Sequence, residues 1–580
     1  MNTIPQKQKV TLHDISDNYL HSMLSNVKDM KAIILDNETQ VIFSLEFSKS
    51  VALKEEIFLF ENIEKITPDQ KFNLSGVFFL RPTETNLKYL KKILENLNFK
   101  EIHLFFTNEI SEDMLYKLAQ YDSNTQIKTI QEVYLDYYII NSNVFHFNID
   151  SCISNLAMTP EDKWTRYDDM MFQRIFDGII AVCLSNRLFP IIKCVKGSWI
   201  CNKLGMKLAE YFKTQIQSDF FRKEWAKGQN GVLFLFDRKE DPVTPLINQW
   251  TYQAMLHEIF GIENNVINYK EEGKKEEKFV ISDKPSEDSF FAAQMNNDYG
   301  KVANEVEQAA ERLKRENAQM DKETSLEQIR KMVDTLQEKK KESTVITKHY
   351  KLFFQLSEYV SSHKLMDLSK IEQDISCHNN KKEQLKLITE IIQDNKISTL
   401  DKAKLYLLYI LRYEGDNTIQ TLKNVMKENS MQEWIEYGDW LIEYAGKNKR
   451  QYDVLSTKSV LSMGKKILMN AFGNDSNVLM QHVSYINELI EMMLKGKLKE
   501  DDIYTVYRSL SGNPIKPEMV VVFNFGGITY EETKDLSTLS EQYQIKIISG
   551  GTTILNSKKF LAELRMLKSK TTEDTYLNVK

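Results

Sequence analysis

Cysteine is scarce in this sequence: the 580 residues contain five, and these stand far apart. An odd and sparse set argues against a disulfide framework and fits a reducing compartment, so we expect a cytoplasmic protein. Cys183, Cys194 and Cys201 are eleven and seven residues apart and lack the close pairs of structural zinc sites. We therefore predict buried thiols at these positions, with no metal ion and no other cofactor.

An excess of one charge is also absent, because Lys and Arg total 76 against 82 for Asp and Glu, a formal net charge of −6. Nucleic-acid-binding domains usually carry a basic footprint, so no nucleic acid is expected as a partner. Long apolar runs are missing too: the stretch that begins at Gly178 is interrupted by Arg187 and falls short of the roughly 20 apolar residues of a membrane span. We see neither a signal segment nor a prenylation box and expect membrane contact only through partner proteins.

Short apolar runs with β-branched and aromatic residues mark the first part of the chain. They begin at Lys31, Glu56, Gly76 and Ile102, and segments with helical spacing lie between them. This alternation predicts a parallel sheet covered by helices. Similar runs begin at Val133 and Gly231.

The next comparable runs come much later, at Met519 and Ile545, and the pattern from about 245 to 500 is overwhelmingly helical. Two isolated strands are marginal in water, so the late strands are expected to join the strands that precede the helical insertion. The sequence thus predicts two α/β domains with parallel sheets, the second of them discontinuous, and a large helical domain. The predicted domains are 1–130 for the first, 131–241 with 505–580 for the second, and 242–504 for the third.

Within the helical region, apolar residues repeat at helical spacing among many charged ones, which predicts a hairpin of two helices at about 296–345. Its first stripe comprises Val302, Val306, Ala309, Leu313 and Met320, and its second comprises Leu326, Ile329, Val333 and Leu336. Two interpretations stay open. The hairpin is either packed on its own domain or a projecting arm that offers its stripe to partner helices.

The stretch LFLFDRKEDPVTPLINQW, residues 233–250, joins a strand to the helical region through a stiff, charged turn. The turn comprises Asp237, Arg238, Asp241, Pro242, Thr244 and Pro245. Pro242 fixes φ after an Asp, Thr244 can cap a helix, and Pro245 suits the first position of a helix that Gly261 can end. The turn is either architectural, or its carboxylates hold Mg²⁺ or act in catalysis at a strand end.

Two motifs that resemble catalytic sites fail on inspection. The segment HEIFG at His257 has Gly261 where a zinc protease needs its second histidine, so His257 is expected on a helix surface. The GKK segments at Gly273 and Gly464 lack the earlier glycine of a phosphate-binding loop.

The segment DRKEDPVTPLINQWTYQAMLHEIFGI resembles the signature of the SM proteins, the syntaxin-binding family of vesicle fusion. Other segments resemble the same family in the same order, from about Lys31 to Ser557: FSLEFSKSVALKEEIFLFE, VFFLRPTETNL, IHLFFTNEIS, QEVYLDYY, IEQDISC, LLYILRYE and ISGGTTILNS. Asn248, Gln249 and Trp250 with the following TYQAM resemble the vacuolar protein sorting class.

This resemblance implies a three-domain arch, a monomer without catalytic activity, and an architectural role for the proline turn. It also implies a SNARE-assembly chaperone, recruited peripherally to trans-Golgi, endosomal or vesicle membranes. Such a protein holds a trans-Golgi or endosomal syntaxin between domains one and three and aligns it with a vesicle SNARE on the hairpin, so that the SNARE complex assembles. The hairpin departs from a common family pattern, because no proline stands near Gln337, and we expect its second helix to run without a break.

The family's pocket for a syntaxin N-terminal peptide maps to Phe106, Leu115 and Leu118. The alternative is that both leucines simply pack their helix on its sheet. Our hypothesis is that Leu118→Arg abolishes peptide binding and leaves the fold intact. Two other functions stay open: a doubly wound enzyme with its site at Asp237, Arg238 and Asp241, and a helical tether or scaffold outside SNARE fusion.

Overall fold

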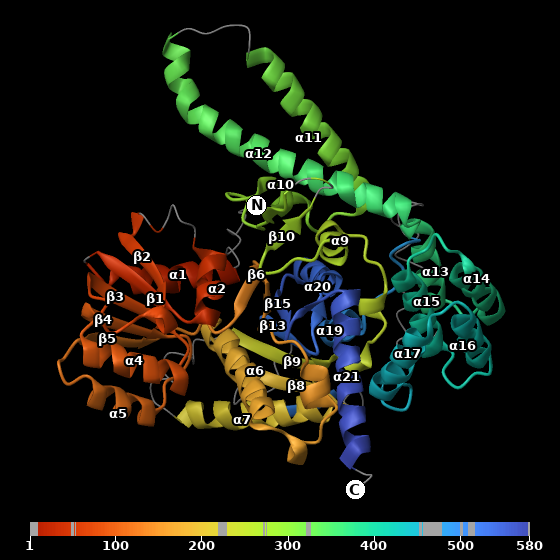
Figure 1. Ribbon diagram of the computed structural model, residues 1–580, viewed down its shortest axis with the longest axis horizontal. Coiled ribbons are helices and arrows are strands. Elements are labelled where there is room, and N and C mark those ends of the chain that lie inside the picture. Colours follow the sequence, from red (N-terminus) through yellow and green to blue (C-terminus); the bar gives the residue numbers. More distant parts are fainter. Residues whose placement is uncertain are drawn as a thin grey trace, which may run out of the picture.

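The structure is a computed structural model that describes a large part of the chain. The described residues are 10–28, 30–47, 52, 54–217, 229–270, 273, 275–320, 326–451, 455, 478–498, 503–507 and 517–577. Figure 1 shows an arch in which a first sheet and a helical region lie at opposite ends of the long axis, with a second sheet between them. Two long helices project from the arch.

Among the described residues, the first sheet has five parallel strands in the order β2-β1-β3-β4-β5. The strands are β1 Lys31–Leu35, β2 Ile57–Asn62, β3 Phe72–Leu80, β4 Phe99–Phe106 and β5 Ile127–Glu132. The helices beside it are α1 Leu12–Ser25, α2 Asn37–Glu46, α4 Glu84–Asn96 and α5 Glu112–Tyr121. All four predicted apolar runs form strands here, and β1 is buried along its whole length, as expected of a central parallel strand.

The second sheet has seven strands within the described part of the chain, in the order β12-β8-β9-β13-β15-β7-β6. They are β6 Tyr138–Asn141, β7 Val144–His146, β8 Leu188–Val195, β9 Gln229–Asp237, β12 Ile503–Tyr507, β13 Met519–Phe525 and β15 Lys546–Gly551. The late strand β13 pairs in parallel with β9 on one side and β15 on the other, through Val521 with Leu233 and Ile548. Strands from before and after the helical region therefore complete one sheet, as predicted.

Four details of this sheet differ from the prediction. The short strands β7 and β12 were not predicted. The pairs β12–β8 and β6–β7 are antiparallel, so only the centre of the sheet is parallel. The strand predicted at Val133 begins at Tyr138. The strand β8 was not predicted, because it follows the helix α6 Arg166–Ser185 within one apolar run. Helices α7 Trp199–Gln217, α20 Tyr530–Tyr543 and α21 Ser557–Leu577 also belong to this part of the chain.

The region between β9 and β12 is mainly helical in its described residues. Its helices are α9 Tyr252–Ile259, α10 Ser289–Gln294, α11 Tyr299–Met320, α12 Leu326–Ser362, α13 Leu365–Cys377, α14 Lys381–Gln393, α15 Thr399–Arg412, α16 Thr418–Glu428, α17 Gln432–Ala445 and α19 Tyr485–Leu494. The prediction missed an antiparallel strand pair, β10 Val266–Tyr269 and β11 Glu277–Val280. The proposed limits of the three domains remain a prediction.

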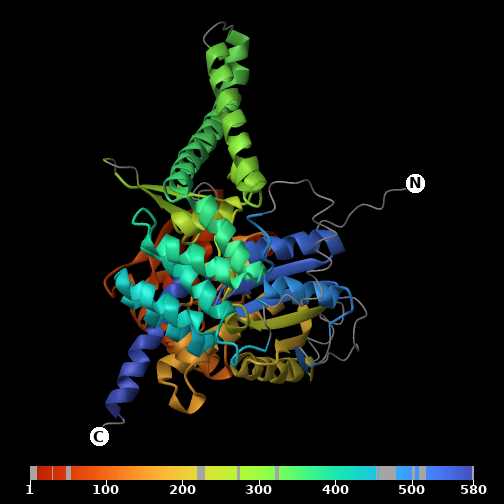
Figure 2. The ribbon, with the colours of Figure 1, turned by 90° about the vertical axis from the view of Figure 1, so that its right-hand side faces the viewer.

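The predicted hairpin consists of α11 and α12, which project together from the arch in both views (Figures 1 and 2). As predicted, α12 continues through Gln337 without a break. The hairpin does not end near residue 345, however, because α12 runs on to Ser362 and buries Leu352 and Leu356 in a core that also contains residues of the second sheet. In the part of the chain that the structure describes, no helix combines the length and apolar character needed to cross a bilayer.

Candidate functional site

The proline turn is buried, and Arg238 is its centre. The Arg238 side chain is fully buried, and its Nη2 donates to Glu532 Oε2 at 2.6 Å and to the carbonyl of Gly527 at 3.0 Å. Its Nη1 donates to the carbonyl of Asp241 at 3.0 Å. Burial alone would lower the pKa of Arg238, but Glu532 and Asp241 outweigh it and raise that pKa, so the guanidinium is charged. The turn is thus fastened to the segment that begins α20.

The two carboxylates of the turn hold the backbone around them. Asp241 accepts hydrogen bonds from the backbone N–H of Thr244 at 3.0 Å and of Tyr485 at 3.0 Å, and from the Thr244 hydroxyl at 2.6 Å. Asp237 accepts from the Ser198 hydroxyl at 2.6 Å. Both aspartates are buried and occupied by bonds to the protein itself, and in the described residues no three His, Cys, Asp or Glu side chains are arranged to hold a metal ion.

The chain after the turn differs from the predicted long helix. Thr244 and Pro245 lie in one turn of 3-10 helix, Thr244–Leu246, and α9 begins only at Tyr252. The cause is tertiary, since other elements take up the intervening backbone groups: Asn248 N–H donates to Glu372 Oε2 at 2.9 Å, and Tyr252 N–H donates to a carbonyl beyond α10. The expectation that Pro245 begins the helix of His257 is therefore wrong.

Asn248, which belongs to the segment that resembles the vacuolar protein sorting class, lies in a buried polar cluster. The Asn248 side chain donates to Glu372 Oε1 at 2.9 Å and accepts from Lys404 Nζ at 2.5 Å. Lys404 lies 3.6 Å from Glu372 and 3.7 Å from Glu258. Glu258 in turn accepts from the backbone N–H of Ser557 at 3.0 Å. Asn248 therefore joins α13 to α15 directly, and Lys404 and Glu258 extend the cluster to α9 and the start of α21, which is a structural role.

His257 is buried, and the expectation that it lies on a helix surface is wrong. Its Nδ1 accepts from the backbone N–H of Ile262 at 2.9 Å, and its Nε2 donates to the carbonyl of Ile554 at 3.3 Å. Burial, followed by the charge of Lys559, lowers the pKa of His257 to about 4, so the ring is neutral. Cys183, as predicted, is a buried free thiol, and so are Cys194 and Cys201.

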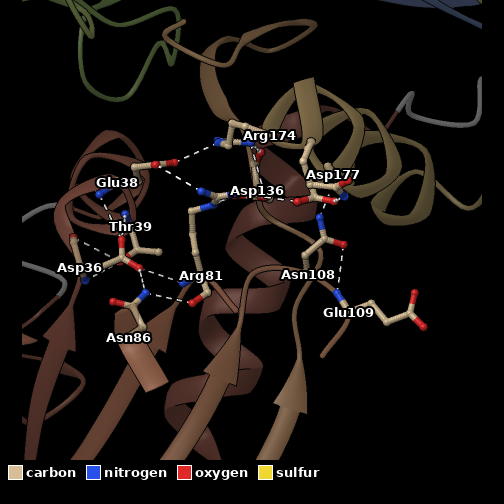
Figure 3. A network of polar contacts seen from close by, with 11 residues as sticks. Asp36, Glu38, Thr39, Arg81, Asn86, Asn108, Glu109, Asp136, Arg174 and Asp177 are labelled. Carbon is tan, nitrogen blue, oxygen red and sulfur yellow. Dashed lines mark hydrogen bonds and ion pairs between the residues drawn. The ribbon is translucent and has the colours of Figure 1, made fainter. Parts of the chain in front are cut away.

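A polar junction that the sequence analysis missed joins the first sheet to α6. Figure 3 shows two arginines that converge on Asp136 from different elements. Arg81, which follows β3, donates from Nε to Asp136 Oδ1 at 2.9 Å, and Arg174 of α6 donates to the Asp136 carbonyl at 3.0 Å. Glu38 of α2 accepts from Arg81 at 3.2 Å and from Arg174 at 2.9 Å. Burial would raise the pKa of Asp136, but Arg174 and Arg81 lower it.

The same junction includes a carboxylate that titrates near neutrality. Burial and the nearby charge of Asp136 raise the pKa of Asp177 to about 6. Below the arginines, Asp36 caps α2 and accepts from the backbone N–H of Arg81 at 2.8 Å and from the Asn86 amide at 2.7 Å (Figure 3). Arg81, in the segment VFFLRPTETNL, thus ties the end of β3 to Asp136 and to α6.

A second junction, also missed, fastens α1 to the helical region through His13. His13 Nδ1 lies 2.8 Å from Glu46 Oε1 and His13 Nε2 lies 2.8 Å from Asp283 Oδ1. Asp283 also accepts from the Ser142 hydroxyl at 2.7 Å, and Lys284 pairs with Glu46 at 2.9 Å. Burial would lower the pKa of His13, but hydrogen bonds to Asp283 and Glu46 raise it to about 9.

The residues predicted for a peptide pocket are only partly at the surface. Phe106 and Leu118 lie inside the core between the first sheet and α5, whereas Leu115 is 38% exposed. Leu118→Arg would place a charge in that core, so the expectation that it leaves the fold intact does not hold. Ile130 on the edge strand β5 is 39% exposed and pairs with Leu104, whose side chain belongs to the core on the α5 side. Leu115 and Ile130 therefore lie on the same side of the sheet.

The stripe predicted on the hairpin divides into two parts. Val302, Val306 and Ala309 at the base of α11 are buried, and Val302 and Val306 belong to the core that also holds Leu352. Leu313, further out, is half-buried. The base of the hairpin is thus packed into a core that contains residues of both the helical region and the second sheet. The side chains of Met320, Leu326, Ile329, Val333 and Leu336 lie outside those that the structure describes.

Comparisons with known proteins match the whole arrangement. The model of the Sec1 family matches residues 31–563. The vacuolar protein sorting-associated protein 45 homolog of Arabidopsis thaliana is 30% identical over 559 residues, with 94% of this chain and 96% of the relative covered. The Homo sapiens vacuolar protein sorting-associated protein 45 is also 30% identical, with 92% of both chains covered. A solved structure of the SM protein Vps45 in complex with the Qa SNARE Tlg2 has a TM-score of 0.84 at 26% identity, with 96% of this chain and 98% of that chain covered.

Proposed function

This chain belongs to the Sec1 family of non-enzymatic SNARE regulators, and from that premise we propose that it binds a Qa SNARE of trans-Golgi and endosomal membranes and templates SNARE complex formation. The observation that carries the proposal is the likeness, over nearly the full length, to Vps45 bound to Tlg2. The family assignment also means that the enzyme considered for Asp237 and Asp241 is wrong. The buried hydrogen bonds of both carboxylates agree with this.

The mechanism begins with a rigid frame. Arg238, Asp136 and His13 each join elements that are far apart in the sequence by charged hydrogen bonds, and so fix the relative positions of the first sheet, the second sheet and the base of the hairpin. A Qa SNARE that is bound to such a frame loses conformational and rotational freedom before the vesicle SNARE binds. The second association then has a smaller entropic cost, which is the physical meaning of templating.

The projecting hairpin α11–α12 is the proposed template for the vesicle SNARE. Its base is anchored by buried residues such as Val302, and α12 continues without a proline break. The arm therefore needs no unfolding of a bend before it presents its outer stripe. We expect the protein to act as a monomer that reaches endosomal, trans-Golgi or vesicle membranes through its SNARE partners.

Capture of SNAREs tests this function. The purified full-length chain is mixed with the cytosolic part of each syntaxin of the same cell, and binding is measured by calorimetry. Stoichiometric binding of one endosomal or trans-Golgi syntaxin is expected, with faster assembly of its SNARE complex in a fluorescence assay. Binding of none of them would reject the proposal. The scaffold alternative predicts helical partners that are retained when residues 1–130 are removed.

The peptide site is proposed at the surface formed by α5 and the edge strand β5, with Leu115 and Ile130 as its exposed apolar side chains. Leu115→Arg and Ile130→Arg place charges at exposed positions and are expected to weaken binding of a syntaxin N-terminal peptide at least about tenfold without unfolding the chain. Met206→Arg, at an exposed position on α7, is the matched control. Equal peptide affinity of all three variants would remove this surface from the proposal.

A further inference from the structure

A surface pocket of about 250 Å³ lies where α15, α16 and α17 meet. Ile410, Ile419 and Ile442, one from each helix, form its apolar walls. Pockets for drug-sized ligands usually measure about 300 to 1,000 Å³, so this one is of a size to take a single apolar side chain from another protein. None of the residues discussed for SNARE binding lines it.

A buried hydroxyl, that of Tyr406, lies behind Gly438 and outside the lining of the pocket. A Cβ atom on Gly438, which lines the pocket, would stand 2.8 Å from Ile410 Cδ1 and 2.9 Å from the Tyr406 hydroxyl. Tyr406 is fully buried, and among the described residues its hydroxyl has no hydrogen-bond partner.

One wall of the pocket borders an acidic ridge on α17. Glu433, Glu436, Asp439 and Glu443 follow one another at spacings of three, three and four, so they share one face of the helix, and all four are exposed. The helix α17 contains no Lys, Arg or His. Lysines of neighbouring elements reach two of these carboxylates: Lys423 lies 2.7 Å from Asp439, and a lysine of α21 lies 3.1 Å from Glu436. Lys423 also lines the pocket, so the negative charge that the ridge offers a partner lies chiefly at Glu433 and Glu443, which form no ion pair within the described part of the chain.

We propose that this pocket and the acidic ridge form a docking site for a basic amphipathic helix of a partner protein. An aliphatic side chain of that helix enters between the three isoleucines, and its Lys or Arg side chains lie along α17. The ridge spans about 15 Å over ten residues, which matches basic residues repeated every three or four positions on a second helix. Charge complementarity of this kind supplies specificity and speeds association.

The position of the site permits a partner and a SNARE to bind together. In Figure 1, α16 and α17 lie at the end of the long axis opposite the first sheet, and Figure 2 shows this end of the molecule towards the viewer. The inference does not rest on the proposed SNARE function. Variants at the ridge are expected to leave syntaxin capture unchanged, so failure of one idea is distinguishable from failure of the other.

The test uses the full-length chain labelled at the isoleucine δ1 methyl groups. The probe is a synthetic helical peptide of about 18 residues with leucines on one face and lysines beside them; a control peptide has Glu in place of each Lys. Addition of the lysine peptide is expected to shift the methyl signals of Ile419 and Ile442, and the Glu peptide is expected to shift neither. Binding is measured in parallel by fluorescence anisotropy at two salt concentrations.

The double variant Asp439→Lys, Glu443→Lys is expected to weaken the lysine peptide at least about tenfold. Glu383→Lys, at an exposed position on α14, is the matched control and is expected to have no effect. Equal weakening by the control, or binding that leaves both methyl signals in place, overturns the site. A dimer in light scattering that the double variant dissociates would show that a second copy occupies the ridge and would also overturn the proposal.

Discussion

The junction at His13 makes the contact between α1 and the helical region depend on pH. His13 is buried between Glu46 and Asp283, and its pKa is raised from 6.5 to about 9. A raised pKa means that the folded state holds the proton more tightly than the unfolded state. The stabilisation is therefore complete below pH 6.5 and is lost as the pH rises through 9.

The size of this effect follows from the same shift. A move from 6.5 to about 9 corresponds to roughly 3 kcal/mol at pH 5, about 2 kcal/mol at pH 7.4 and less than about 0.5 kcal/mol at pH 9. His13→Gln removes the charge and leaves two buried carboxylates facing each other with Lys284 as their remaining cation nearby. We expect the variant to open this junction about thirtyfold more often at pH 7.4, and only about twofold more often at pH 9.

Hydrogen exchange measured by mass spectrometry checks this prediction. Wild type and His13→Gln are compared at equal pH, from pH 6.5 to 9.5, for peptides that cover α1 and residues 281–288. His21→Gln, on the exposed side of α1 where the histidine is 72% exposed, is the control and should match wild type throughout. A difference between His13→Gln and wild type that stays the same from pH 6.5 to 9.5 would refute the reasoning, because it would show that the charge of the ring is not involved.

Other predictions follow from buried charges and core positions. Arg238→Met leaves the buried carboxylate of Glu532 unpaired and is expected to destabilise the fold by about 3–5 kcal/mol. The double variant that also carries Glu532→Gln should recover part of this loss, and thermal unfolding measures both. Asp136→Asn should reduce the free energy of unfolding by a similar amount at neutral pH. Because the pKa of Asp136 is lowered in the folded state, its charge stabilises the fold above pH 3.8, and this stabilisation is lost as the pH falls through the folded pKa. The difference in stability between the variant and wild type should therefore shrink in acid. Leu118→Arg should lower the unfolding temperature, whereas Leu115→Arg should leave it nearly unchanged; the reverse order would contradict the burial of Leu118.

The strands and the family were readable from the sequence because both depend on local patterns. The runs at Lys31 and Gly76 are buried on both faces, and continuous apolar runs of this kind signal central parallel strands. The separation of Gly231 from Met519 by a helical region also predicted that β9 and β13 share a sheet. Collinear motifs then gave the family.

The remaining features depend on a single backbone conformation or on contacts between distant residues. Arg187 adopts φ +52° between α6 and β8, and one residue in that conformation ends a helix and starts a strand inside a single apolar run. His257 is buried by a strand that lies about 300 residues later in the chain. The cation His13 meets Asp283, 270 positions away. No window of the sequence contains these pairs, so local reasoning placed His257 at the surface and missed the junction.

The central position of β13 has a consequence for how the protein is made. The strand β9 is synthesised early, but β13, which pairs with the free edge of β9, comes from the last part of the chain. Ribosomes add about 5–20 residues each second, so the edge of β9 waits on the order of 15 to 60 seconds for its partner. During that interval the nascent chain displays an apolar strand edge of the kind that aggregates, and shielding by a chaperone would be needed until the polypeptide is nearly finished. Premature stop codons anywhere in the long helical insertion should therefore yield insoluble fragments rather than partly active proteins.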